Sequence, residues 1–544
     1  MRVSLFFFLF ITHFAQSQEH AWIYFKDKPN ASVYLSNPNL MLTQKAIDRR
    51  VKQEIDIVKN DVPLDPYYVE LVAVSTGISI KARSKWMNAV HVLGFQTDIE
   101  NLLNLSFVDK IEFANKNINN KNLSTVNKTS KIFRVNKLKS SLDYGFSENQ
   151  ATMLEVDKFH NAGFYGAGLE IAIIDGGFLG VDTAGAFSHL VDANLENGEI
   201  LGGYDYVHNS SDFYTNTGTT HGTQVLSTIG AIIENEFVGT APKASFYLFV
   251  TEDANYETPL EESLWVQAAE KADSLGVDIL NTSLGYSEFD ESKYNYSYAD
   301  MNGRTTFISR GATIAAQKGM VVVNSAGNSG NDAWKYITAP ADADGVVTVG
   351  SVNFNENISY FSSFGPTVDG RIKPETVAQG GGVYIVDENN TVKPSNGTSF
   401  SGPIVAGVTA CLWQAYPQKT SLEIRQMLIE SSKDFLAPTP QGGYGVLKIG
   451  SLLLENLSSG LNSNKPSFIV VNLPKSKTLE FVFKKNQKEP LSVEVFSAIG
   501  NQLMNTKITK ENNKINYQSF KTGVYYLRYS YLSESKLLTL IVSN

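Results

Sequence analysis

Three residues with complementary chemistry are spread over the middle of the chain: Asp175, His221 and Ser399. A serine hydroxyl becomes a nucleophile when a neighbouring base takes its proton, and histidine can act as that base near neutral pH. A carboxylate that holds the other ring nitrogen fixes the tautomer and stabilises the imidazolium. If the fold brings the three together, the sequence predicts nucleophilic catalysis by a serine.

Ser399 lies in the glycine-bracketed stretch Asn396–Pro403, directly before an apolar run from Ile404 to Leu412. A loop that leads into a buried helix has this pattern. Ser399 is therefore expected near a helix N-terminus, where free backbone N–H groups favour developing negative charge. Taken alone, Ser399 or Ser401 would be read as a helix N-cap, so the assignment depends on partners elsewhere.

Asp175 follows the strand-like run Leu169–Ile174, and His221 precedes a helical pattern with apolar residues such as Val225 and Ile229. In isolation, an acid at a strand end is as often a cap or turn former, and a lone histidine is more often structural. All three residues nevertheless fall at a strand end or a helix start. Ligand sites of parallel sheets gather at the carboxyl ends of the strands.

The elements that would position these residues alternate along the segment from Tyr144 to about Leu454. Short apolar runs are separated by helical patterns such as Glu261–Leu275 and Thr305–Lys318. Strands that are apolar on both faces, with helical crossovers, predict an α/β fold with a parallel, doubly wound sheet. The predicted strands are Leu169–Ile174, Ser245–Val250, Val277–Leu280, Met320–Val323 and Val346–Val349.

The N-terminal part of the chain divides into three segments. Residues 1–17 combine Arg2, a short apolar run and the small residues before Gln18, which predicts a secretory signal peptide. Residues 18–114 read as a small α+β unit. Residues 115–143 are rich in Lys, Asn and Ser, and we expect a solvated linker that contains a processing site, with a passive spacer as the alternative.

The C-terminal segment, residues 462–544, reads as a small β-sandwich that follows the expected central domain at 144–458. From Leu461 onward there are 12 Lys and Arg against 5 Glu, whereas the whole chain of 544 residues has a formal net charge of -9. That overall charge argues against a general nucleic-acid binder. The single cysteine, Cys411, cannot form an internal disulfide and is expected to be a buried apolar residue.

Five segments resemble the signature blocks of subtilisin-like serine proteases, in the order found in that family, over about Ala151 to Leu452. They are Ile174–Gly177, His221–Thr223, Asn281–Gly285, Ser325–Asn328 and Gly397–Pro403. The order of acid, histidine and serine along the chain is also that of subtilisin.

The resemblance implies roles at the matching positions. Ser399 would be the nucleophile, His221 the general base and then acid, and Asp175 the orienting carboxylate. Asn328 would donate its side-chain N–H to the oxyanion beside the Ser399 backbone N–H. A further three residues would form an edge that pairs with extended substrate: Ser283, Leu284 and Gly285.

Three positions depart from the family pattern without removing a catalytic group. Gln224 stands where a second histidine is common, Gly402 stands where alanine is usual, and Gln379 replaces a frequent proline. These differences put the local geometry in doubt, and Gly402 most of all. The predicted activity is unaffected.

Acidic residues cluster after the strand Ser245–Val250, in a loop that borders the substrate cleft of the family. An acidic rim there could favour basic peptides, although a solvated loop and helix start is the preferred interpretation. Tyr286–Gly303 reads as an insertion that could shape the cleft or bind calcium. No metal ligands and no cofactor are assigned, with calcium allowed as a structural ion. The acidic residues are Glu252, Asp253, Glu257, Glu261 and Glu262.

The flanking modules fit the same resemblance. Residues 18–114 resemble the inhibitory propeptide of the family, and Val495–Asn501 with Thr522–Leu527 resemble the C-terminal sorting domain of type IX secretion in Bacteroidetes. The alternative for the second module is an ordinary substrate-binding or stabilising sandwich. Its expected partner is the secretion machinery.

We therefore expect a secreted serine endopeptidase, made as a zymogen, that hydrolyses protein or peptide substrates through an acyl-enzyme on Ser399. Its location would be extracellular or at the cell surface, and no nucleic-acid partner is expected. The alternative is a catalytically silent binding or adhesion protein on the same scaffold. An esterase of the α/β-hydrolase type is disfavoured because Ser401 stands where G-x-S-x-G has its final glycine.

Overall fold

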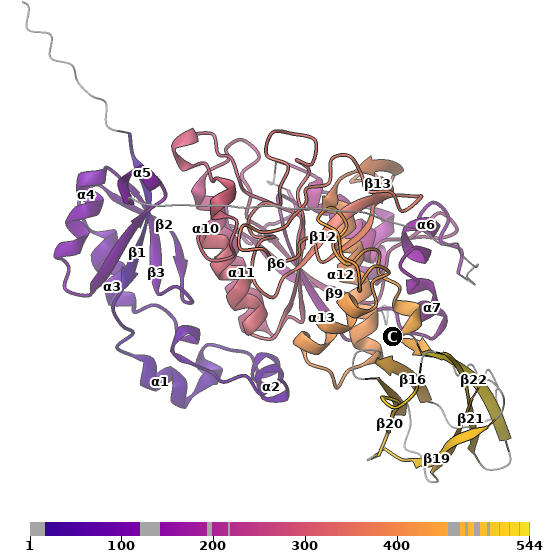
Figure 1. Ribbon diagram of the computed structural model, residues 1–544. Helices are drawn as coiled ribbons and strands as arrows, with labels where there is room; N and C mark the ends of the chain where they lie inside the picture. Colours follow the sequence, from indigo (N-terminus) through magenta and orange to yellow (C-terminus); the bar gives the residue numbers. More distant parts are fainter. Residues whose placement is uncertain are drawn as a thin grey trace, which may run out of the picture.

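The structure is a computed structural model. It describes residues 17–119, 142–192, 198–215 and 218–454, and in the C-terminal part residues 468–473, 477–483, 490–497, 501–510, 512–521, 523–531 and 534–542. The predicted signal peptide apart from Ser17, and the predicted processing segment apart from its ends, lie outside the described residues. Figure 1 shows an N-terminal unit, a large central α/β domain and a smaller β-rich region, in the order of the sequence.

The central domain is built on an eight-stranded sheet with the order β14-β13-β12-β11-β10-β5-β9-β6. The pairs from β6 to β13 are parallel, and β14 joins the edge in the antiparallel sense. The predicted parallel, doubly wound α/β sheet is thus confirmed. The strands are β5 (Glu170–Asp175), β6 (Ile200–Asp205), β9 (Ser245–Val250), β10 (Ile279–Thr282), β11 (Val321–Ser325), β12 (Val347–Asn353), β13 (Thr376–Val386) and β14 (Val392–Asn396).

Helices cover both faces of this sheet, because alternate residues of each buried strand point to opposite sides. Ile171 and Ile173 of β5 pack in one core with α9 (His221–Gly230) and α12 (Thr398–Ala415). The intervening residues of β5 pack on the other side, against two further helices. These are α10 (Pro259–Leu275) and α11 (Phe307–Gln317).

The bounds of α10 follow from its terminal residues. Thr258 and Glu261 form a capping box, in which Glu261 Oε2 accepts the Thr258 N–H at 2.8 Å, and Pro259 occupies the first helical position. Gly276 ends the helix with φ of +94°, a left-handed conformation that glycine adopts without strain. Shorter helices of the central domain are α6 (Glu148–Thr152), α7 (Val156–Asn161), α8 (Ser188–Val191) and α13 (Ser421–Glu430).

The N-terminal unit has its own antiparallel sheet with the order β2-β3-β1-β4. Its predicted α+β character is confirmed, and Ile23, Val90 and Ile99 belong to a core separate from that of the central domain. The strands are β1 (Glu19–Phe25), β2 (Ile78–Ser84), β3 (Ala89–Gly94) and β4 (Val108–Phe113). The helices are α1 (Ala31–Ser36), α2 (Gln44–Lys52), α3 (Pro66–Ala73), α4 (Gln96–Asn101) and α5 (Lys116–Asn119).

One face of this N-terminal sheet, opposite to the face that carries its own core, packs on α10 and α11. Trp22 stacks on Phe307 with ring centroids 4.8 Å apart, and its indole N–H donates to Ser263 Oγ at 2.7 Å. Glu270 of α10 accepts hydrogen bonds from the backbone N–H groups of Lys85 and Trp86, both at 2.9 Å. Because α10 lies between two packed layers, it is buried nearly all round.

The C-terminal region contains two four-stranded sheets, with the orders β15-β16-β17-β20 and β19-β18-β21-β22. Residues such as Leu479, Val493 and Leu527 form its core. The strands are β15 (Leu453–Leu454), β16 (Phe468–Leu473), β17 (Thr478–Phe483), β18 (Leu491–Ser497), β19 (Gln502–Ile508), β20 (Lys514–Asn516), β21 (Gly523–Tyr531) and β22 (Glu534–Val542). β15 pairs with β16, and Leu453 of β15 also belongs to the core of the central domain, so the two regions meet at this strand.

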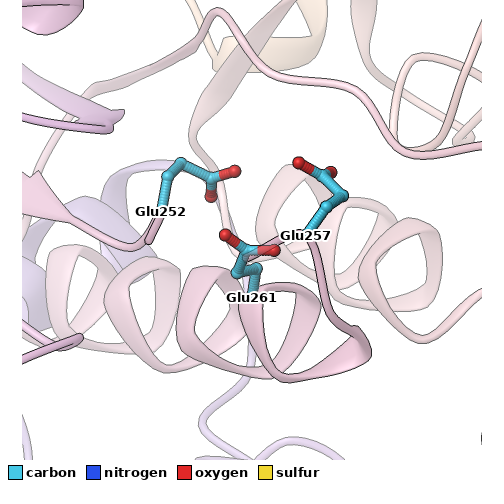
Figure 2. Close-up of side chains that lie close together, drawn as sticks. All are labelled: Glu252, Glu257 and Glu261. Atoms are coloured by element: carbon cyan, nitrogen blue, oxygen red, sulfur yellow. The ribbon is translucent and has the colours of Figure 1, made fainter. Parts of the chain in front are cut away.

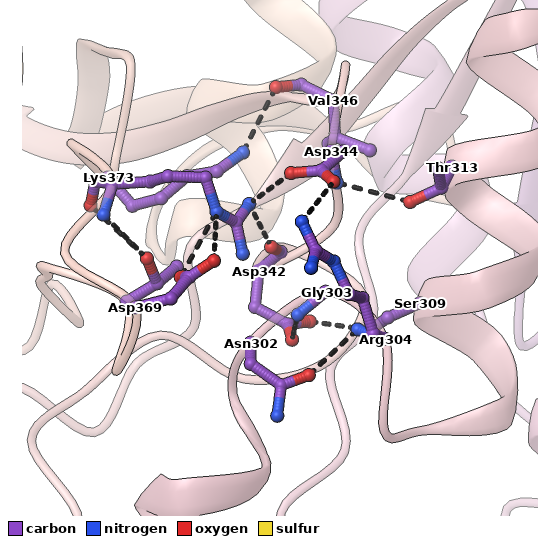
Figure 3. A network of polar contacts seen from close by, with 12 residues as sticks. Asn302, Gly303, Arg304, Ser309, Thr313, Asp342, Asp344, Val346, Asp369 and Lys373 are labelled. Carbon is purple, nitrogen blue, oxygen red and sulfur yellow. Dashed lines mark hydrogen bonds and ion pairs between the residues drawn. The ribbon is translucent and has the colours of Figure 1, made fainter. Parts of the chain in front are cut away.

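A polar network around the buried Asp342 ties the inserted segment Tyr286–Gly303 to the loops around β12 (Figure 3). Asp342 accepts the Gly303 N–H at 2.6 Å and the Ser309 hydroxyl at 2.5 Å. Arg371 donates to the Asp342 backbone oxygen at 2.7 Å and pairs with Asp344 at 2.9 Å. These contacts fix the end of the insertion. Elsewhere the insertion touches the N-terminal unit, where Lys116 pairs with Asp300 at 2.7 Å.

Candidate active site

Asp175 and His221 meet at the carboxyl edge of the central sheet. Asp175 is the last residue of β5 and is fully buried, and its Oδ1 accepts from His221 Nδ1 at 2.7 Å. The Gly176 N–H donates to the same oxygen at 2.8 Å. Because Nδ1 carries a proton toward the carboxylate, Nε2 of the neutral ring is the atom that can accept one.

The surroundings of His221 raise its pKa above the usual 6.5. Burial alone would lower it, but the charge of Asp175, its hydrogen bond and the charge of Glu252 stabilise the imidazolium more strongly. The ring is still one-third exposed, at 33% of the side chain, so it links a buried carboxylate to the surface. An imidazole in this position suits a general base.

Ser399 lies at the start of α12, as the sequence predicted. The helix contains Pro403, which has no N–H for the carbonyl of Ser399 four residues earlier. Ser283 supplies the missing donor, because its hydroxyl bonds to the Ser399 carbonyl at 2.8 Å. Because of Pro403, the Ser399 carbonyl is free to accept the Ser283 hydroxyl, and this hydrogen bond holds Ser399 next to the end of β10.

The hydroxyl of Ser399 donates to the carbonyl oxygen of Ser283 at 3.4 Å. Among the described residues, no hydrogen bond within 3.5 Å joins Ser399 Oγ to His221. The histidine lies beside the next residue, with 6.0 Å between its ring centroid and that of Phe400. Catalytic hydrogen bonds of this kind are often long before substrate binds.

Asn328 is clamped to the residue that precedes Ser399. Its Oδ1 accepts from both the backbone N–H and the hydroxyl of Thr398, each at 2.9 Å. Its Nδ2 makes no such contact in the described part of the chain, and neither does the Ser399 backbone N–H. Two unused donors therefore lie close to the serine. The family resemblance marks Asn328 as a candidate donor, whereas the contacts with Thr398 that orient its side chain were not predicted.

The segment Ser283–Gly285 leaves β10 without entering another strand. Its Leu284 carbonyl accepts from the Asn324 side chain at 3.2 Å, and the next residue, Tyr286, forms an antiparallel bridge with Ala339. Gly285 is exposed, and a Cβ there would lie 2.1 Å from Thr338 Oγ1. The segment is thus an anchored stretch at the end of β10, outside the paired strands, of the kind that an extended peptide can pair with.

Three of the five acidic residues noted in the sequence converge beside this site (Figure 2). Oxygens of Glu252, Glu257 and Glu261 all lie within 4.8 Å of one another. Burial raises the pKa of Glu252 to about 8, that of Glu257 to about 7 and that of Glu261 to about 10. The sequence favoured a solvated loop followed by a helix start. Glu261 does lie in the first turn of α10, but the three carboxyl groups are more buried than those of a solvated loop.

This acidic cluster does not fit a calcium ion. Calcium takes six to eight oxygen ligands. Both carboxyl oxygens of Glu261 already accept backbone N–H groups, from Asp253 and Thr258. One oxygen of Glu252 accepts from the Tyr286 and Thr251 hydroxyls. Among the described side chains this leaves one oxygen of Glu252 and two of Glu257, fewer than calcium takes, so these carboxylates alone do not make a calcium site.

The departures from the family pattern have modest effects on the local geometry. At Gly402, an added Cβ would lie 3.5 Å from the nearest atom, the backbone nitrogen of Ser325, so alanine would fit there as well. Gln379 bonds to the Asn149 side chain at 2.5 Å, and Gln224 donates to Thr220 at 3.3 Å. Ser401 bonds to the Thr398 carbonyl within α12, and Cys411 is fully buried.

Comparison with known proteins agrees with this geometry. Residues 166–446 match the subtilase family, Peptidase S8. Residues 20–131 match the Peptidase S8 propeptide domain of Bacteroidota, and residues 473–543 match the secretion system C-terminal sorting domain. The last match indicates a secreted or cell-surface protein. No described helix is long and apolar enough to cross a membrane.

Relatives and solved structures support the same assignment. Subtilisin DY of Bacillus licheniformis is 31% identical over 299 residues, which cover 55% of this chain and 95% of that protein. A thermostable alkaline protease of Halalkalibacterium halodurans is 28% identical over 300 residues, covering 55% and 71%.

The crystal structure of an epidermin leader peptide processing serine protease from Staphylococcus aureus has the same fold. It superposes with a TM-score of 0.53 at 16% identity, over 80% of this chain and 97% of the other. Together with the family match over residues 166–446, these similarities show that the chain belongs to the subtilase family of serine proteases.

Proposed function

We propose that Asp175, His221 and Ser399 are the catalytic triad of a serine endopeptidase. The observation that carries this proposal is the 2.7 Å hydrogen bond between His221 Nδ1 and the buried Asp175, next to the helix α12, whose second residue is Ser399. A buried acid that orients an imidazole beside a serine is the arrangement that acyl transfer requires.

The reaction proceeds through an acyl-enzyme. Ser399 Oγ attacks the scissile carbonyl carbon while His221 Nε2 takes the hydroxyl proton, and Asp175 stabilises the resulting imidazolium. His221 then gives the proton to the leaving amine as the C–N bond breaks. Water attacks the Ser399 ester with His221 again as base, which releases the acid product and restores the serine.

Charge on the substrate oxygen is stabilised by two donors, the Asn328 side chain and the Ser399 backbone N–H. Both are unused in the described part of the chain, and the first is oriented by Thr398. The start of α12 adds the positive end of its dipole. Donors fixed before the reaction stabilise the oxyanion without reorganisation, so they act mainly on the transition state.

The edge Ser283–Gly285 binds the substrate backbone on the side of the cleft where Ser399 Oγ points. The contact between Ser399 Oγ and the Ser283 carbonyl supports this placement. Pairing through backbone groups gives affinity without fixing a sequence. The substrates are therefore extended protein or peptide segments.

The flanking modules make the enzyme a secreted zymogen. The propeptide is proposed to inhibit the enzyme until the segment 115–143 is cut, and the module at 462–544 is proposed to be read by the secretion machinery. Deletion of residues 466–544 is expected to leave the protein in the periplasm. Normal release of the truncated chain would contradict this role.

The chemistry proposed here uses only side chains and backbone groups of the chain, so no cofactor takes part in it. Calcium in a structural role is tested by adding a chelator to the processed enzyme. A lowered Tm with unchanged kcat at a temperature well below the transition indicates a structural ion. A loss of kcat there contradicts the metal-free mechanism.

Activity and specificity can be tested in one experiment. The processed enzyme is incubated with a peptide library, and the cleavage sites are read by mass spectrometry, while a fluorophosphonate probe labels the nucleophile. Internal cleavage with labelling at Ser399 is expected. An unlabelled, inactive protein after removal of the propeptide would favour a silent binding protein on the same scaffold.

A further inference from the structure

The helix α2 of the propeptide docks on the C-terminal end of α10. The Thr43 N–H donates to the Ser274 carbonyl at 2.9 Å, and the Thr43 hydroxyl donates to the Leu275 carbonyl at 2.8 Å. Carbonyls in the last turn of a helix have no partner within the helix. Here the propeptide supplies those partners. It also lies so close that a Cβ on Gly276 would be 2.7 Å from the Ala46 nitrogen.

Two adjacent arginines of α2 converge on one carboxylate of α10. Arg49 Nη2 lies 2.5 Å from Asp273 Oδ1, and Arg50 Nη2 lies 2.8 Å from each of the two Asp273 oxygens. All three side chains are at most 4% exposed. Arg49 also bonds to the backbone oxygen of Val277. Both guanidinium groups therefore meet the negative end of the α10 dipole as well as the Asp273 charge.

A second ion pair lies next to the first, and in this one the propeptide carries the acid and the enzyme the base. Asp61 of the propeptide lies 2.7 Å from the ammonium group of Lys318, which follows α11, and 3.1 Å from Arg50. Gln53 adds neutral contacts, because its oxygen accepts from the N–H and hydroxyl of Ser421, both at 2.9 Å. Opposite charges on the two sides thus alternate across this contact, which fixes its register.

This contact lies at the opposite edge of the sheet from the triad. Lys45 of α2 pairs with Glu170 at 2.8 Å, and Glu170 is the first residue of β5, whereas Asp175 is the last. Five strand steps of about 3.3 Å separate the two ends by about 17 Å. In Figure 1, α1 and α2 extend from the N-terminal sheet along the lower side of the central domain.

We propose that the C-terminal end of α10 is a binding site for a helix with two adjacent arginines, and that it holds the propeptide on the enzyme after the chain is cut. This inference rests on the proposed zymogen function and adds a second anchor, remote from the cleft. The site comprises the Asp273 carboxylate and the carbonyls of residues 273–275 and 277. Its occupant is α2 of the propeptide.

The physical reason is that a cut propeptide is held by non-covalent contacts alone. Truncating one member of a buried, hydrogen-bonded charge pair leaves the other charge buried with too few partners, and such changes act mainly on the dissociation rate. Loss of Arg50 removes two hydrogen bonds to Asp273 and the link to Asp61. The dissociation of the cut propeptide should therefore become faster.

The test uses the full chain with Arg50→Gln or Arg49→Gln. After cleavage and release, these variants yield the same mature enzyme as the wild type, because both residues leave with the propeptide. Dissociation of the cut propeptide is followed by size-exclusion chromatography and by the lag before peptide hydrolysis. We expect release about 100-fold faster for Arg50→Gln. Asp273→Asn, which changes the enzyme and not the propeptide, should also accelerate the release of the propeptide.

Lys45→Gln is the matched control, since Lys45 lies on the same helix and pairs with Glu170 and Asp278 but is 39% exposed. An exposed pair contributes little, so release should change less than about fivefold. Release at the wild-type rate in Arg50→Gln would overturn the proposed anchor. So would an equal acceleration in Lys45→Gln.

Two further results separate the possible failures. If the mature wild-type enzyme does not hydrolyse peptides, the proposed function fails, while size exclusion still tests the anchor in cleaved chains. If Arg50→Gln does not accumulate as an active enzyme, Ser399→Ala and Ser399→Ala/Arg50→Gln full chains are compared by hydrogen exchange. Faster exchange in α2 and the last turn of α10 supports the anchor, and unchanged exchange there overturns it.

Discussion

Asn328 and Thr398 are joined by two hydrogen bonds that end on a single oxygen, Asn328 Oδ1. One of the donors is a backbone N–H, which cannot accept, so the oxygen of the amide must face Thr398 and its NH₂ group must face away. Thr398 directly precedes Ser399, whose N–H is the other proposed oxyanion donor. One clamp therefore sets the relative position of both donors.

Replacing Asn328 by leucine should remove one oxyanion donor while keeping a side chain of similar size. We expect kcat to fall about 10²- to 10³-fold, the range found in subtilisin for loss of one such donor, with little change in KM. Steady-state kinetics on a peptide substrate would measure both. A similar rise in KM with kcat unchanged would assign Asn328 to substrate binding instead.

Thr398→Val tests the clamp separately from the donor. The variant keeps the backbone N–H but loses the hydroxyl, and one hydrogen bond is worth about 0.5–1.5 kcal/mol. Since about 1.4 kcal/mol corresponds to a factor of ten in rate, the expected loss in kcat is about 2- to 10-fold. Thr398→Ser retains the hydroxyl and should behave like the wild type. A loss in Thr398→Ser with none in Thr398→Val would point instead to packing of the methyl group, which valine keeps.

Ser399→Ala should abolish hydrolysis and self-processing of the 115–143 segment, with a fall in kcat of about 10⁶-fold, the order known for the subtilisin nucleophile. Fluorophosphonate labelling should vanish with it. Ser401→Ala is the matched control, because among the described residues its hydroxyl bonds only to the Thr398 carbonyl in the same helix. Labelling that persists in Ser399→Ala would show that the nucleophile is misassigned.

The strands β5, β9, β10, β11 and β12 were predicted from the sequence, whereas the interior strand β13 and the edge strands β6 and β14 were not. Ser245–Val250 was predicted with the bounds that β9 has, because an interior strand is apolar on both faces. The edge strands β6 and β14 contain two glycines and Pro394, respectively, and are only half-buried. Edge strands tolerate such residues because one side needs no ladder partner.

The positions of Asp175, His221 and Ser399 were predictable for a different reason: each lies at a strand end or a helix start, which the sequence marks. The hydrogen bond from Ser283 that holds the Ser399 carbonyl was not predicted, although Pro403 in the sequence indicated that this carbonyl needs a donor. Pro403, four residues on, removes the donor for the Ser399 carbonyl, and Ser283 replaces it. Convergence of Glu252, Glu257 and Glu261 depends on how a loop folds back onto α10, which local periodicity does not encode.

The pH dependence of the enzyme should report the pKa of His221. Only the neutral imidazole accepts the Ser399 proton, so kcat/KM rises as pH increases through that pKa, which lies above 6.5. Asp175→Asn removes the charge that raises the pKa and leaves burial, which lowers it. In Asp175→Asn, the rise of kcat/KM with pH should therefore occur at lower pH, and kcat should fall about 10⁴-fold. If the rise stays at the same pH, a group other than His221 controls it.

Glu252 gives a second, separable ionisation near the triad. Burial and the charge of Glu257 raise its pKa to about 8, and its own charge raises the pKa of His221. As pH passes about 8, Glu252 becomes negative and should strengthen the polarisation of the His221 ring. In the Ser399→Ala chain, the NMR resonance of the His221 Nδ1 proton should thus shift near pH 8. Glu252→Gln should abolish that shift, and Glu257→Gln should move it to lower pH, because one repelling charge is gone. If the shift persists in Glu252→Gln, the ionisation belongs to another group.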